Sequence, residues 1–126
     1  MKTTKEDVLA VTQALEDYYF KGIYEGDTDK LRKVLNPGTL LFADIKGQPY
    51  FKTLDDYLDG VANRQSPKDS GKPFKGTVIS VEVINTIPVA NVHVKMYEFN
   101  YDELLSFHKI DNRWMMVNKM FTDVSV

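Results

Sequence analysis

The sequence predicts an α+β fold in which three N-terminal helices pack on a strongly curved, mixed but mainly antiparallel β-sheet. Apolar residues recur at helical spacing in three segments within the first 64 residues. From residue 74 to residue 121, apolar and polar residues alternate as they do along strands. Short connections join these strands, which favours antiparallel neighbours. Helices that come before a sheet of this kind can cover one of its faces, which defines the class.

Each predicted helix has a boundary signal. The helices are expected at residues 5–24, 29–35 and 54–64. Gly26 closes the first, because glycine accepts the left-handed backbone of a helix C-terminus. Pro37 and Gly38 end the second, since proline cannot continue a helix. Thr53 is the expected N-cap of the third. The polar, aperiodic segment 65–73 is predicted to be a flexible loop, and it is either a lid or, as is more common for such loops, a solvated connection.

Six strands are expected, at residues 40–45, 49–52, 74–84, 89–99, 101–110 and 113–121. Pro49 suits a sheet edge, because proline cannot donate to the hydrogen-bond ladder. Asp111 and Asn112 are typical of a two-residue hairpin turn. Strict alternation in the last strand predicts Trp114 and Asn118 on one face and Lys119 on the other, so Asn118 and Lys119 cannot both line a cavity.

Composition narrows the functional classes. The 126 residues are a common size for a single domain, so we expect one domain over residues 1–126. The absence of cysteine excludes disulfides, thiolate metal sites and a cysteine nucleophile. With 16 basic and 18 acidic residues and no basic stripe, nucleic-acid binding is not expected. No apolar stretch approaches the ~20 residues that span a bilayer. The polar N-terminus favours a cytoplasmic protein.

Five short motifs, in this order, resemble the nuclear transport factor 2-like superfamily, which includes SnoaL-like cyclases and ketosteroid isomerases. They are YEGD at 24–27, TLDDY at 53–57, YDELLSF at 101–107, IDNRW at 110–114 and VNKMF at 117–121. The last is similar to the end of the lumazine-binding subgroup. The resemblance covers about residues 7–121. It implies a cone whose sheet wraps around the first and third helices, a cavity between them, and a homodimer formed through the outer face of the sheet. It implies no single activity, because one fold hosts many functions.

Asp102 is the preferred catalytic candidate. By alternation it shares a strand face with Leu104, Ser106 and His108. A carboxylate on an otherwise apolar face inside the helix–sheet interface would be desolvated, which suits general acid or base chemistry. His108 is its candidate hydrogen-bonding partner. The alternative is an Asp102 that is solvated, or bound to a loop amide, near the start of its strand.

Aromatic side chains supply the candidate ligand-binding residues. They are Tyr18, Tyr19 and Tyr57 on the helices, with Trp114 and Asn118 on the last strand. A tyrosine hydroxyl at a cavity orients a ligand, whereas the alternative for each ring is core packing. Ketosteroid isomerases join a first-helix tyrosine to pocket aspartates. The nearest equivalents that this resemblance implies are Tyr18 or Tyr19 with Asp44 and Asp102.

The chain offers no sign of a metal site or a cofactor. Its two histidines, His93 and His108, lack the spacing of a helical metal pair, and no cysteine can complete a ligand set. Three functions remain open. The first is a module that binds an unidentified small molecule without chemistry. The second is an acid–base enzyme of the isomerase, cyclase or dehydratase kind that uses Asp102. The third is a dimeric protein-interaction domain.

Overall fold

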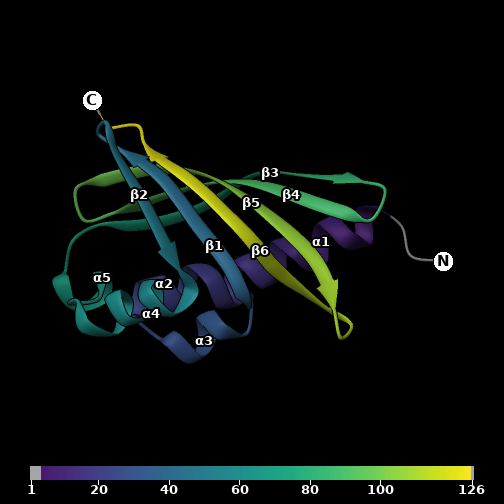
Figure 1. The fold of residues 1–126 in the computed structure, drawn as a ribbon, viewed down its shortest axis with the longest axis horizontal. Coiled ribbons are helices and arrows are strands. Elements are labelled where there is room, and N and C mark those ends of the chain that lie inside the picture. Colours follow the sequence, from purple (N-terminus) through teal and green to yellow (C-terminus); the bar gives the residue numbers. More distant parts are fainter. Residues whose placement is uncertain (1–3, 126) are drawn as a thin grey trace.

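One mixed, six-stranded sheet curves over a layer of helices in the computed structural model, which describes residues 4–125 (Figure 1). Residues 1–3 and 126 lie outside this described part. The strand order is β2-β1-β6-β5-β4-β3. The pairing of β1 with β6 is parallel and the other four pairings are antiparallel. The predicted fold class is therefore confirmed, and β2 lies at an edge as Pro49 indicated.

The elements have the following bounds. The helices are α1 (Thr4–Ala14), a π-helical segment (Leu15–Phe20), α2 (Lys21–Glu25), α3 (Thr28–Arg32), α4 (Leu54–Asn63) and α5 (Pro67–Ser70). The strands are β1 (Leu35–Ile45), β2 (Gln48–Thr53), β3 (Phe74–Ile84), β4 (Ile87–Met96), β5 (Phe99–Ile110) and β6 (Arg113–Asp123). Between residues 4 and 125, no helix is both long and apolar enough to cross a membrane.

The first predicted helix is one continuous run that contains a widened turn. The residues that flank the π-helical segment, Ala14 and Lys21, keep right-handed helical dihedrals, so the chain passes through it without a break. Gly26 ends the run with a φ of 69°, as predicted. Tyr19 lies within the widened turn and is fully buried. Single π turns inside α-helices often occur at functional sites.

The second predicted helix is shorter than expected. It ends at Arg32, and Leu35 pairs with Met116 as the first residue of β1. The prediction that the helix continues to residue 35 is therefore wrong, because pairing with β6 overrides local propensity. Pro37 and Gly38 lie in a stretch of β1 where the register shifts.

The third predicted helix is confirmed, but the segment after it is not a structureless loop. The Thr53 side chain caps α4 by accepting the Asp56 N–H at 3.3 Å. Ser66 caps the short helix α5 by accepting the Asp69 N–H at 3.1 Å, and Pro67 is buried. A serine N-cap followed by proline at the first helical position is a helix-start signal. The prediction of a flexible loop missed it.

A β-bulge in β6 reverses the predicted alternation. Phe107 pairs with Met116 and Ser106 pairs with Asn118, so Val117 is an extra residue. Trp114 packs against the hydrophobic core on the helix side of the sheet, and Asn118 lies on the outer face. The prediction that these two share a face is wrong. Asn118 and Lys119 do lie on opposite faces, as expected, and Lys119 is the inner one.

Candidate functional site

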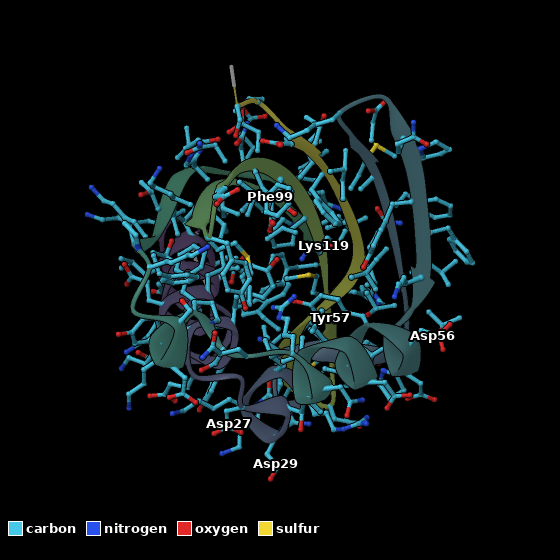
Figure 2. All side chains as sticks on the ribbon, turned by 90° about the vertical axis from the view of Figure 1, so that its left-hand side faces the viewer. Asp27, Asp29, Asp56, Tyr57, Phe99 and Lys119 are labelled. Atoms are coloured by element: carbon cyan, nitrogen blue, oxygen red, sulfur yellow. The ribbon has the colours of Figure 1, made fainter. Side chains whose placement is uncertain are left out.

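A cavity of about 150 Å³ lies between the inner face of the sheet, the first helical run and α4. Six aromatic rings line it, those of Tyr50, Tyr57, Tyr97, Phe99, Tyr101 and Phe121. Two cations, Arg64 and Lys119, and one anion, Glu103, line it as well. In Figure 2, Lys119, Tyr57 and Phe99 lie inside the ring that the sheet and α4 form, whereas the labelled aspartates of the helices lie on its rim.

A buried carboxylate occupies the inner part of this site. Glu103 is 2% exposed, although its strand neighbour Leu104 is 50% exposed. The Tyr19 hydroxyl donates a hydrogen bond to Glu103 Oε1. The other carboxylate oxygen, Oε2, lies 3.7 Å from Lys119 Nζ. Glu103 pairs with Phe121 and Leu105 pairs with Lys119, so Glu103 and Lys119 are diagonal neighbours on one sheet face.

The Lys119 ammonium is buried among ring faces. The residue is 3% exposed. Its Nζ lies 4.6, 4.8 and 5.2 Å from the ring centroids of Phe121, Tyr57 and Tyr19. A buried charge is costly unless it is paired. One carboxylate and three cation–π contacts provide the compensation here.

The tyrosine hydroxyls of the site stay protonated. Burial raises the pKa of Tyr19 well above its usual value, and the negative charge of Glu103 adds to this. Burial also raises the pKa of Tyr50 and that of Tyr101 to about 12. The positive charge of Arg64 opposes all three pKa shifts but is outweighed by burial. At neutral pH these hydroxyls are therefore hydrogen-bond donors.

The mouth of the cavity is tied to the end of α4. Tyr97 has a φ of 52°, an unusual backbone for a bulky residue, which costs about 1–3 kcal/mol. Its hydroxyl donates to the carbonyl oxygen of Gln65, and the Arg64 guanidinium lies 5.9 Å from the centre of its ring. These contacts join the β4–β5 turn to the start of segment 65–73, which consequently borders the mouth.

The structure brings two of the three predicted tyrosines to the site. Tyr57 lines the cavity and Tyr19 holds Glu103. Tyr18 points elsewhere: Lys33 Nζ lies 5.6 Å from its ring centroid, and it lines a separate pocket together with Trp114. The prediction that Trp114 and Asn118 share one ligand-binding face fails because of the bulge at Val117.

Asp102 lies on the outer face of the sheet, and its side chain is 47% exposed. Its carboxylate is 2.9 Å from Nδ1 of His93, its cross-strand partner, whereas His108 is exposed further along β5. The expectation of a desolvated Asp102 at the helix–sheet interface is therefore wrong. Alternation grouped it correctly with Leu104 but did not say which face the helices cover. Asp44 is also exposed, and it accepts the Gly47 N–H.

Sequence reasoning missed Glu103 and Lys119. A signal was available in β5, since Glu103 alternates with Tyr101, Leu105 and Phe107. A carboxylate in such an apolar series, with a lysine in the next strand, is typical of an inward-facing ion pair. Within residues 4–125, no group of three or more histidine, aspartate or glutamate side chains is arranged to hold a metal.

The outer face of the sheet carries a second, open groove of about 500 Å³. Phe42, Leu104 and Met120 line it together with Asn91 and Asp102. Large apolar side chains on this side of the sheet are 39–56% exposed, namely those of Leu40, Phe42, Phe51, Leu104 and Met120. The outer face is thus apolar at its centre.

Comparison with known families settles the family of this protein. The model of the family described as "Putative lumazine-binding" matches residues 6–122. The chain belongs to this family. A comparison with curated protein sequences finds no match. The family model confirms the subgroup indicated by the closing VNKMF motif.

Solved structures show that this member of the lumazine-binding family has the nuclear transport factor 2-like fold. An NTF2-like protein of unknown function from Shewanella baltica has a TM-score of 0.85 at 16% identity, with 100% of each chain covered. An NTF-2-like protein of unknown function from Silicibacter pomeroyi has a TM-score of 0.84 at 19% identity, covering 97% of this chain and 99% of the other. The S. rosetta CaMKII hub has a TM-score of 0.70 at 18% identity, covering 93% and 96%.

Proposed function

We propose that this protein binds a small molecule in the aromatic cavity above Glu103 and Lys119. The observation that carries the proposal is the buried ion pair itself. Both charges are almost fully buried and both line an aromatic cavity. Ligand sites combine apolar and aromatic walls with a few placed polar groups, and this cavity has that composition.

The volume of the cavity supports a ligand of modest size. Drug-sized ligands occupy pockets of about 300–1,000 Å³. An apolar protein cavity of about 150 Å³ binds a benzene molecule. The volume of this cavity, about 150 Å³, therefore matches one six-membered ring. A bicyclic heterocycle such as lumazine, which the family's description names, would extend toward the mouth near Tyr97 and Arg64.

Methionine methyl groups provide a test that also locates the bound molecule. Met96 lines the cavity, whereas Met120 lines the outer groove. With methyl-labelled methionine, titration with lumazine is expected to shift the Met96 methyl resonance and to leave that of Met120 unchanged. Binding should also raise the melting temperature, because a ligand that binds only the folded state stabilises it. If the Met96 resonance does not move with lumazine or with smaller aromatic probes, the proposal fails.

Self-association through the outer face is a second candidate function. The exposed apolar residues of β1, β5 and β6 favour it, since a large exposed apolar patch marks an interaction site. We propose a second copy of this chain as the partner. Light scattering after size exclusion should show a dimer that Leu104→Glu converts to a monomer, whereas Ile84→Glu, near the β3–β4 turn, leaves it dimeric. A monomeric wild type at micromolar concentration contradicts this proposal.

An acid–base reaction in the same cavity is the remaining alternative. It rests on Glu103 as proton acceptor beside neutral tyrosine hydroxyls, because Asp102 lies outside the cavity. Conversion of a bound carbonyl compound by the wild type, abolished in Glu103→Gln, would establish it. A cytoplasmic location belongs to the same set of proposals and rests on the absence of cysteine from the sequence.

A further inference from the structure

The charges that line the cavity do not cancel. Arg64 and Lys119 are cations and Glu103 is the one anion among the lining residues. One positive charge is therefore left over, and it belongs to Arg64, which is exposed at the mouth, whereas Lys119 is buried among the rings. The charge of a buried group such as Lys119 acts more strongly than one at a solvated surface.

The side chains that line the cavity also offer more hydrogen-bond donors than carboxylate acceptors. The Lys119 ammonium and the Arg64 guanidinium can only donate, and the protonated hydroxyls of Tyr50 and Tyr101 can donate as well. Glu103 is the one lining carboxylate, and the Tyr19 hydroxyl already occupies its Oε1. A donor-rich cavity is complementary to a ligand that is rich in acceptors.

The Lys119 ammonium retains capacity for a further partner. Its separation of 3.7 Å from Glu103 Oε2 is an ion pair but is longer than a hydrogen bond. An ammonium has three N–H donors. Among the described residues Lys119 has Glu103 as its ionic partner, and its ammonium also lies against the ring faces of Tyr19, Tyr57 and Phe121. Ring faces attract the cation but accept no strong hydrogen bond, so its donors remain available.

We infer that the cavity takes a planar aromatic monoanion, such as a ring carboxylate or an enolate. Its charged oxygen would lie against Lys119, its ring would lie among Tyr57, Tyr101 and Phe121, and Arg64 would face it from the mouth. This inference rests on the proposed binding function and names the charge class of its ligand.

Benzoate and benzamide form a matched pair of probes, because they have nearly the same shape and differ in charge. Methyl-methionine NMR titrations give both the affinity and the place of binding. Benzoate is expected to bind about tenfold more tightly than benzamide, a difference that one favourable charge contact can supply. The shift is expected at Met96, in the cavity, and not at Met120.

Two variants should change the preference for benzoate in opposite directions. Glu103→Gln removes the anion and is expected to tighten benzoate binding several-fold while leaving benzamide unchanged. Lys119→Met combined with Glu103→Gln leaves no unpaired buried charge, so it should fold, and it should lose the preference for benzoate. Lys95→Met is the matched control, because Lys95 is exposed on β4 and away from the cavity.

The outcomes separate this inference from the function on which it rests. Equal affinities for the two probes at Met96, or tighter benzamide binding, overturn the anionic ligand and leave the binding function standing. A benzoate preference that survives in the double variant also overturns it. If neither probe shifts the Met96 resonance although lumazine does, the inference fails and the binding function stands; if lumazine does not shift it either, or if only Met120 responds, both fail.

Discussion

Glu103 and Lys119 lie on neighbouring strands, and their side chains meet inside the cone with 3.7 Å between Oε2 and Nζ. Both side chains are almost fully buried, with Glu103 2% exposed and Lys119 3% exposed. Such a pair is weak support for stability in itself, because desolvation offsets the attraction. Removal of one partner, however, leaves an uncompensated charge. This asymmetry gives the first prediction.

Lys119→Met should destabilise the fold by about 3–5 kcal/mol, because it leaves Glu103 buried and unpaired. The double variant Lys119→Met/Glu103→Gln should regain most of this loss. Denaturant unfolding measures both free energies. The control Lys95→Met, at an exposed position, should change stability by no more than about 0.5 kcal/mol. A single variant as stable as the wild type would show that the pair is not buried in solution.

Tyr19→Phe should cost about 1.5–3 kcal/mol, since it removes a buried hydrogen bond to a charged group. Tyr18→Phe is the matched control on the same helical run. Its hydroxyl has no hydrogen bond among those of the described residues, so a change within about 0.5 kcal/mol is expected. Thermal or urea unfolding of the two variants gives the comparison. Equal losses would contradict the specific role of the Tyr19 hydroxyl.

The raised tyrosine pKa values predict a loss of stability at high pH. The pKa of Tyr50 and that of Tyr101 are about 12 in the folded protein and near the ordinary tyrosine value of 10.0 in the unfolded chain. Between these values the unfolded chain binds fewer protons than the folded one, so stability falls as the pH rises. Ultraviolet titration of phenolate should therefore show three tyrosines, Tyr19, Tyr50 and Tyr101, ionising late, and Tyr50→Phe should remove one of them. Ionisation of all tyrosines near pH 10 would refute the burial.

Two glycines should respond to alanine in opposite ways. A Cβ at Gly76 would clash with the Phe20 ring, so Gly76→Ala should cost about 1–3 kcal/mol through overpacking. A Cβ at Gly60, inside α4, meets nothing within 4 Å. Gly60→Ala should therefore stabilise the protein by about 0.5–1 kcal/mol through helix propensity. Melting temperatures that move in the same direction would contradict the packing of β3 on the first helical run.

Local chemistry in the sequence was sufficient for most of the elements. The Thr53 cap, the left-handed Gly26 and the Asp111–Asn112 turn each act within a few residues, and each is found where it was predicted. Ser66 and Pro67 carried an equally local signal that was overlooked. The family motifs correctly indicated the cone.

The candidate site depended on the tertiary structure. Alternation of period two groups side chains by face, but it does not identify the face that the helices cover, so it grouped Asp102 with Leu104 and left Glu103 unnoticed. The extra residue Val117 then shifts the alternation, so that the side chains of β6 on either side of it follow different patterns of inner and outer faces. Period-two alternation cannot anticipate such a bulge. The sequence by itself determined the elements and their order. Only the packing of helices on one face, and a bulge formed by pairing with β5, decided that Glu103 and Lys119 meet inside.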